Sequence, residues 1–123
     1  MKTLLLTGFE PFLSFTVNPT MKIVEELNGQ NIGDFHIIGK TMSVDFAKSG
    51  SQLISLIEEI KPDAVISLGL AGGRSKITPE RIAINVKDGA ADNEGNAPED
   101  EVIHQDGPAG YLSTLPIRAM VEK

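Results

Sequence analysis

Two short apolar runs, each followed by a glycine and separated by helical patterns, limit the folds open to this chain. The runs are residues 4–6 (LLL) and 64–68 (AVISL), which precede Gly8 and Gly69. Continuous apolar runs of this length are typical of strands buried on both faces of a parallel sheet. They therefore predict a sheet that helices cover, rather than one with a solvated face.

Helical patterns lie between these runs. Asn18-Pro19 is an N-cap followed by a proline at the first turn, and Asn28-Gly29 is a stop signal. Residues 35–42 are expected to form a strand, and residues 45–60 a longer helix that ends at Lys61-Pro62. The order strand, helix, strand, helix, strand predicts an α/β domain with a largely parallel sheet.

The second half of the chain has a weaker pattern. Ile82, Ile84 and Val86 alternate with other residues, which predicts a strand with one buried face. Residues 88–108 are acidic and rich in glycine, and we expect a long surface loop there. A short helix is expected after Leu115-Pro116. We expect residues 1–123 to form a single α/β domain whose last residues lie within that helix.

Composition excludes several classes of protein. The net charge is −6, which argues against binding to nucleic acid or to an anionic membrane surface. No apolar run approaches the roughly 20 residues of a membrane span, and the apolar run near the N-terminus is too short for a signal peptide. We expect a cytoplasmic protein with neither nucleic acid nor a membrane as a partner. The sequence has no cysteine, which excludes disulfides.

Three sequence features are candidates for a functional site, and each has a plain structural alternative. Residues 69–74 (GLAGGR) match no nucleotide-binding motif, and they form either a tight turn or a backbone cradle for a ligand. Glu80 lies in phase with the alternating strand. It either forms an ion pair with Arg74 or Arg81, or orients a histidine. Phe9 and Phe12 follow the first strand, where they either line a pocket or cap the core.

Neither histidine supports a metal site. His36 falls in an expected strand and His104 in the acidic loop, and the two share no metal-ligand spacing. The acidic loop fails as a calcium loop because Ala90 stands where the first side-chain ligand is needed.

Several motifs, in order, resemble pyroglutamyl peptidase type I (pyrrolidone carboxyl peptidase). Each motif is weak alone, but the ordered set is specific and covers essentially the whole chain. The motifs are TGFEPF at 7–12, NP at 18–19, GGR at 72–74, ITPERIAIN at 77–85, DNEG at 92–95, DGPA at 106–109 and LPI at 115–117.

The resemblance implies a three-layer α/β/α sandwich with a mixed, mainly parallel sheet. It implies a cysteine exopeptidase that removes N-terminal pyroglutamate from peptides through a Cys–His–Glu triad, without a cofactor or metal. Members are cytoplasmic and commonly form homo-oligomers, often tetramers. By position, Glu80 matches the triad carboxylate. The expected substrate-binding residues are Phe9, Phe12, Asn18 and Leu70.

The chain also departs from the family. The positions of the catalytic cysteine and histidine fall beyond Lys123, and neither histidine present matches. Leu13-Ser14 stands where the family often has two glycines, Leu70 where it often has glutamine, and residues 89–91 lack the usual Arg-Ile-Pro. We therefore expect the N-terminal part of such a peptidase, inactive by itself. The alternative is a non-catalytic ligand-binding or assembly module with the same fold.

Overall fold

The structure is a computed structural model that describes residues 1–12 and 16–123. The departure at residues 13–14 lies outside the described residues. The chain divides into two compact units, which we call the sheet unit (Met1–Leu70 with Ala91–Asn96) and the hairpin unit (Ala71–Ala90 with Ala97–Lys123). This division does not test the expected single domain, which stays a prediction.

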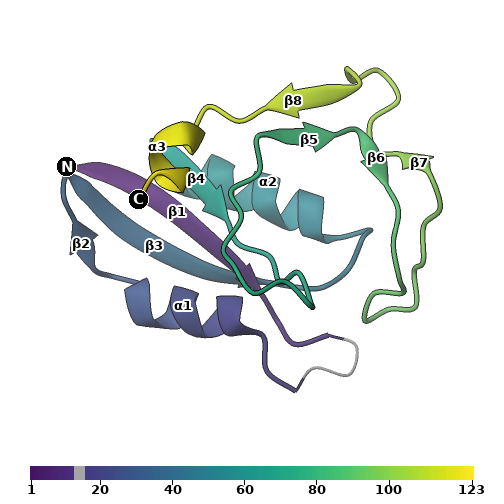
Figure 1. Cartoon of the computed structure of the whole chain (residues 1–123), viewed down its shortest axis with the longest axis horizontal. Helices are drawn as coiled ribbons and strands as arrows, with labels where there is room; N and C mark the ends of the chain where they lie inside the picture. The colour runs from purple at the N-terminus through teal and green to yellow at the C-terminus, as the bar shows by residue number, and fades with distance from the viewer. Residues whose placement is uncertain (13–15) are drawn as a thin grey trace. The chain divides into compact units, whose positions relative to one another are not determined.

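The sheet unit contains a four-stranded mixed sheet in the order β2-β3-β1-β4 (Figure 1). The central strand β1 runs parallel to both β3 and β4, while the short β2 is antiparallel to β3. The predicted mixed, mainly parallel sheet is therefore confirmed. The strands are β1 (Lys2–Phe9), β2 (Asn31–Ile32), β3 (Phe35–Met42) and β4 (Ala64–Ser67).

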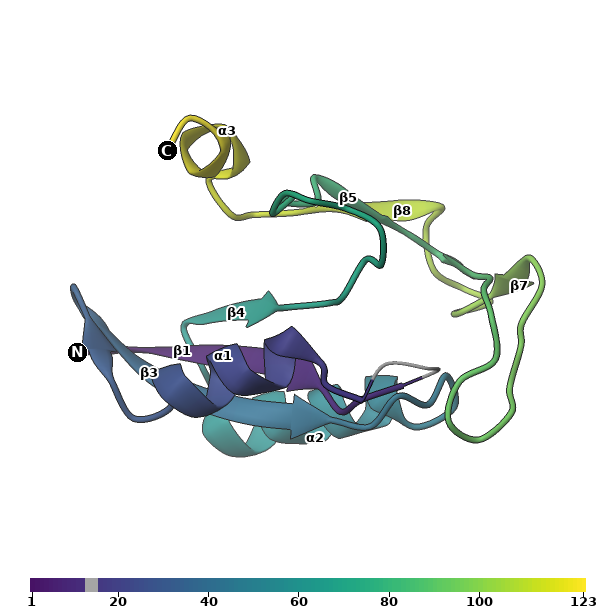
Figure 2. The ribbon, with the colours of Figure 1, turned by 60° about the horizontal axis from the view of Figure 1, so that its bottom comes forward.

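Helices α1 (Pro19–Leu27) and α2 (Ser49–Ile60) lie on opposite faces of this sheet, as Figure 2 shows. The α1 boundaries follow the sequence, because the Asn18 side chain accepts a hydrogen bond at the N-terminus and Asn28 ends the helix. The predicted start of the second helix at residue 45 was wrong by four residues. There the Asp45 carboxylate accepts hydrogen bonds from the amides of Ala47 and Lys48, which stabilises a turn instead of the helix.

The core of the sheet unit lies between α1 and the sheet. Leu6, Val24 and Ile37 pack together there and are at most 5% exposed. Gly8 and Gly39 let the helix approach the strands closely. A Cβ at either position would lie 2.7 Å from a helix carbonyl oxygen. The position of α1 over the sheet therefore depends on these two glycines.

The hairpin unit is built from two small antiparallel pairs and a short helix. Strand β5 (Ile82–Ile84) pairs with β8 (Gly110–Leu112), and β6 (Val86–Lys87) pairs with β7 (Glu101–Val102). Helix α3 (Ile117–Val121) confirms the helix predicted after Leu115-Pro116. Part of the expected surface loop at 88–108 thus forms strand β7.

The single strand expected from Ile82 to Val86 was wrong. Asn85 separates β5 from β6 and is 6% exposed. Its side chain exchanges two hydrogen bonds with the backbone of His104, at 2.8 and 2.9 Å. The expected buried face of this strand was also wrong, since Ile82 and Ile84 are 54% and 61% exposed. Among the described residues, no helix has the length and apolar character needed to cross a membrane.

Candidate functional site

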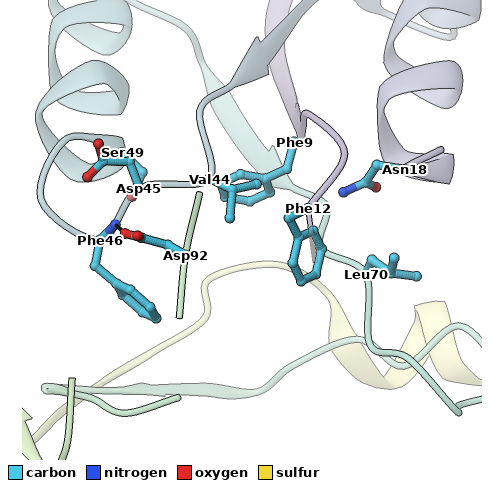
Figure 3. Close-up of a pocket in the computed structure, with 10 residues that line it drawn as sticks. Phe9, Phe12, Asn18, Val44, Asp45, Phe46, Ser49, Leu70 and Asp92 are labelled. Atoms are coloured by element: carbon cyan, nitrogen blue, oxygen red, sulfur yellow. Dashed lines mark hydrogen bonds between the residues drawn. The ribbon is translucent and has the colours of Figure 1, made fainter. Parts of the chain in front are cut away.

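A pocket opens in the sheet unit beside the carboxyl end of β1 (Figure 3). Ligands of open α/β sheets bind at this edge, outside the carboxyl ends of the strands. All four residues expected to bind substrate line it. The lining residues are Phe9, Phe12, Asn18, Val44, Asp45, Phe46, Ser49, Gly69, Leu70 and Asp92.

Asn18 builds the wall of this pocket through an internal hydrogen-bond network. Its side chain is fully buried, and its Oδ1 accepts hydrogen bonds from the amide and the hydroxyl of Thr20, at 3.0 and 2.7 Å. Its Nδ2 donates to the Glu10 carbonyl, and the Thr20 hydroxyl accepts from the Phe9 amide at 2.9 Å. Asn18 thus holds the segment after β1 against α1. Its expected contact with substrate stays a prediction.

Asp92 is a pocket residue that the sequence reasoning missed. Its carboxylate accepts hydrogen bonds from the amides of Phe46, Glu94 and Asn96, at 2.6, 2.9 and 2.8 Å, and from the Asn96 side chain. Burial raises the pKa of Asp92, but these hydrogen bonds outweigh it and lower the pKa to about 2. The pocket wall therefore carries a negative charge at neutral pH.

Neighbouring hydrogen bonds join three segments around the pocket. The Asn93 side chain donates to Glu10 Oε1 at 3.1 Å and to the Pro11 carbonyl at 3.0 Å. Glu10 Oε1 also accepts from the Val44 amide at 3.1 Å, and the Asn93 amide donates to the Val44 carbonyl. The segments after β1 and β3 and the turn at residues 92–96 are therefore fixed to one another before any ligand binds.

The other lining residues that were missed carry only a topological signal. Four of them, Val44, Asp45, Phe46 and Ser49, lie between β3 and the first residue of α2. Strand β3 runs parallel to β1 as its neighbour, so both strands end at the same edge. Asp92 had a stronger signal, because it belongs to the DNEG motif at 92–95. Parallel pairing, once known, would have placed Val44, Asp45, Phe46 and Ser49 at this edge, but not Asp92, which follows no strand of the four-stranded sheet. Gly69 belongs to the segment at residues 69–74 that the sequence offered as a candidate site.

Glu80 lies in the hairpin unit, in a groove shared with Ile82 and Leu112. Its carboxylate is 3.5 Å from Nη1 of Arg74, which confirms the ion pair expected as the plain alternative. The pair is weak because both side chains are largely exposed, that of Arg74 by 55% and that of Glu80 by 75%. The same guanidinium nitrogen also donates to the Thr78 hydroxyl at 2.9 Å. A carboxylate held this loosely remains accessible to another partner.

The two histidines lie outside the pocket lining. His36 Nδ1 contacts Asn31 Oδ1 at 2.8 Å, and His104 is held through its backbone by Asn85. Within residues 1–12 and 16–123, no group of three or more His, Cys, Asp or Glu side chains is arranged to hold a metal ion.

Comparison with known proteins finds relatives similar in sequence and in fold. The chain is 59% identical to pyrrolidone-carboxylate peptidase of Lysinibacillus sphaericus over 123 residues, which is all of this chain and 60% of that protein. The crystal structure of Bacillus amyloliquefaciens pyroglutamyl peptidase I superposes with a TM-score of 0.95 at 46% identity, over 99% of this chain and 60% of that one. Pyrrolidone carboxyl peptidase from Thermococcus litoralis gives the same TM-score at 43% identity, over 99% of this chain and 56% of that one.

The chain thus spans about 60% of the length of the curated relatives it matches. Sequence identity and the superposed fold extend over nearly all of its own residues. The family model for pyroglutamyl peptidase matches residues 1–123. The chain belongs to the pyroglutamyl peptidase family.

Proposed function

We propose that this chain supplies the substrate pocket and the triad glutamate of a cysteine exopeptidase that removes N-terminal pyroglutamate from peptides. The observation that carries the proposal is the pocket with Phe9 and Phe12 in its wall. The pyroglutamyl ring is a small, flat, uncharged lactam. Aromatic faces suit such a ring, and Gly69 and Leu70 line the same pocket, where their backbone groups would satisfy its amide.

The chemistry needs groups that this sequence does not contain. A thiolate attacks the pyroglutamyl carbonyl, and a histidine then protonates the departing amine. The sequence has no cysteine, and neither of its histidines lines the pocket. Glu80 would hold the imidazole in position and stabilise the imidazolium. We therefore expect the chain alone to bind the lactam without cleaving a peptide.

A ligand titration tests the pocket directly. The chain is titrated with L-pyroglutamate and observed by heteronuclear NMR, with L-proline as the matched ligand that lacks the lactam carbonyl. A ligand this small is expected to bind with a Kd of about 1 mM, and substitution of Phe9 or Phe12 by alanine is expected to weaken binding about ten-fold or more. Tyr111→Ala in the hairpin unit is the control. Equal shifts with L-proline would contradict the proposal.

The alternative is a non-catalytic binding or assembly module. One observation favours it: the pocket lies wholly in the sheet unit, which has its own core. Hydrolysis of a pyroglutamyl-coupled chromogenic amide separates the two proposals. It is measured with and without a polypeptide that corresponds to the part of a family member's sequence that this chain does not match. Activity that appears only on its addition, and is lost in Glu80→Gln, supports the peptidase. Activity of the chain alone that Glu80→Gln abolishes would contradict both.

We also propose a compartment and an oligomeric state, both by analogy with the family. We place the working protein in the cytoplasm as a homo-oligomer, a tetramer by analogy, with N-terminally pyroglutamylated peptides as its partners. Sedimentation velocity of the purified chain measures the state of assembly, and a monomer at all concentrations would count against assembly by this chain alone.

A further inference from the structure

The pocket of the sheet unit has two carboxylates in its wall and no cation among its described lining residues. Asp45 and Asp92 are 6% and 9% exposed, and none of the described residues that line the pocket is a lysine, an arginine or a histidine. Buried carboxylates are usually paired with a cation, because removing a charge from water is costly. The binding of an uncharged lactam does not by itself explain two such groups on one wall.

The two carboxylates are neighbours on this wall. The amide of Phe46, which directly follows Asp45 in the chain, donates a hydrogen bond to Asp92 Oδ2 at 2.6 Å. Figure 3 shows Asp45 and Asp92 together on one side of the pocket, with Asn18 on the opposite side. The two negative charges therefore act on a bound ligand from the same side, and their effects add.

Hydrogen bonds hold both carboxylates in place but leave one oxygen open. Asp92 accepts from three backbone amides and from the Asn96 side chain, so both of its oxygens are occupied. Asp45 Oδ1 accepts from the amides of Ala47 and Lys48, whereas Asp45 Oδ2 has no hydrogen-bond partner among the described residues. No buried side-chain oxygen of those residues lacks a partner, so Asp45 Oδ2 is in contact with solvent.

Ion pairs do not neutralise these carboxylates. Within residues 1–12 and 16–123, every ion pair lies in the hairpin unit: Arg74–Glu80, Lys87–Glu101 and Arg118–Glu122. The Glu10 carboxylate accepts a hydrogen bond from the amide of Val44, a lining residue, and adds a third negative charge close to the pocket. The electrostatic potential within the pocket is therefore negative.

A negative pocket distinguishes the substrate from the product of the proposed reaction. Hydrolysis of a pyroglutamyl peptide bond consumes one water, and at neutral pH it yields a pyroglutamate carboxylate and a protonated amine. The ring is the same in substrate and product, but the substrate has an uncharged amide where the product has a carboxylate. A carboxylate held close to two others is repelled, and the repulsion is strongest where water is excluded.

We propose that Asp45 and Asp92 make this pocket bind the uncharged pyroglutamyl amide in preference to the pyroglutamate anion, so that the product leaves more readily than the substrate. The inference rests on the proposed function for the identity of the ring, and it adds the charge state of the ligand that the pocket selects. Asp45 and Asp92 are specificity-determining residues in this assignment, because they act on the ligand through their charge and take no part in bond cleavage.

Three ligands with the same ring test the effect of charge. L-pyroglutamamide, L-pyroglutamate and the methyl ester of L-pyroglutamate are titrated into the chain at neutral pH and low salt, and binding is observed by heteronuclear NMR. The amide and the ester are expected to bind about ten-fold more tightly than the carboxylate, and added salt should narrow the difference. The ester is uncharged but lacks the amide N–H, so it separates the effect of charge from that of hydrogen bonding.

Substitutions identify the source of the discrimination. Asp45→Asn keeps an oxygen for the amides of Ala47 and Lys48 but removes the charge, so it should narrow the ratio of amide to carboxylate affinity about three-fold. Asp92→Asn should narrow the ratio by a similar factor. Asp34→Asn is the matched control and should leave the ratio unchanged, because Asp34 is exposed in the turn before β3, at the end of that strand away from the pocket.

Folding of each variant is checked by the NMR signals of strands β1 and β3. Equal affinity for the amide and the carboxylate overturns the inference and leaves the proposed function intact. A ratio that Asp45→Asn and Asp92→Asn both leave unchanged also overturns it, since a merely structural role weakens all three ligands alike. An ester that binds as weakly as the carboxylate overturns it and assigns the preference to the amide N–H. Binding of none of the three ligands contradicts the proposed function, and the inference fails with it.

Discussion

The sheet unit and the hairpin unit contain similar apolar side chains but use them differently. Leu6 and Ile37 of the sheet unit are 5% and 2% exposed, whereas Ile84 and Leu112 of the hairpin unit are 61% and 73% exposed. All four lie in strands. The difference is that helix α1 covers Leu6 and Ile37. An apolar pattern therefore predicts a strand, but burial needs a second layer on that face.

This contrast extends to the function. The pocket lies in the unit that has a core, and its wall is fixed by hydrogen bonds of Asn18, Asp92 and Asn93. Glu80 lies in the unit that has little core, and an exposed ion pair holds it. The pocket wall is thus held by hydrogen bonds within the sheet unit, whereas Glu80 is held only by an exposed ion pair.

The largest expected effect is a difference in the free energy of unfolding between substitutions of one leucine in each unit. Leu6→Ala leaves a cavity in a packed core and should lower the free energy of unfolding by about 2–5 kcal/mol. Leu112→Ala removes an exposed side chain and should change it by less than about 0.5 kcal/mol. Chemical denaturation of both variants measures the difference. Equal losses would show that the hairpin unit has a core of its own.

The next effect tests the close approach of α1 to the sheet. An alanine at Gly39 would place its Cβ 2.7 Å from the Val24 carbonyl oxygen. Gly39→Ala should therefore destabilise the chain by about 1–3 kcal/mol. Gly50→Ala is the control, because no atom lies within 4 Å of an added Cβ there and alanine favours α2. It should stabilise by about 0.5–1 kcal/mol. A neutral Gly39→Ala would mean that α1 shifts readily.

The pH dependence of stability tests the charged pocket wall. The pKa of Asp92 falls from its usual 3.8 to about 2 on folding. Its contribution is therefore fully present above about pH 4 and is lost as the pH falls toward 2. Asp92→Asn should reduce stability at neutral pH and flatten the decline between pH 4 and 2, as measured by thermal unfolding across pH. An unchanged acid profile in the variant would contradict the lowered pKa.

The smallest expected effect concerns the ion pair of Glu80. Arg74 and Glu80 are both more than half exposed, so Arg74→Ala should cost at most about 1 kcal/mol of stability. A double-mutant cycle with Glu80→Gln isolates the pair itself. A coupling well above this value would mean that Glu80 is held firmly within the hairpin unit before any partner binds.

Local signals predicted the sheet unit well. The boundaries of β3 and the ends of α1 follow from patterns and caps within a few residues of each boundary. The predicted start of α2 was wrong because Asp45 forms a competing turn. The prediction of one continuous strand from Ile82 to Val86 failed because the break at Asn85 depends on hydrogen bonds to His104, which lies far along the chain.

The residues of the candidate site also divide into those that the sequence predicted and those that depend on contacts between distant segments. Phe9 and Phe12 were predicted to line a pocket because they follow a strand whose carboxyl end defines a binding edge, whereas Leu70 was named through the family resemblance. Asp92 was missed as a lining residue because it reaches the pocket through a hydrogen bond to the Phe46 amide, 46 positions earlier in the sequence. No local pattern reports such a distant pairing.

The sequence by itself determined the α/β class, the family, and the strands and helices whose signals lie within a few residues of one another. Tertiary structure alone decided which apolar faces are buried and which segments meet at the pocket. The physical reason is the separation along the chain over which each kind of interaction acts. Propensity, capping and periodicity act between chain neighbours, whereas burial and hydrogen bonds such as that from Phe46 to Asp92 depend on chain positions that only the folded packing brings together.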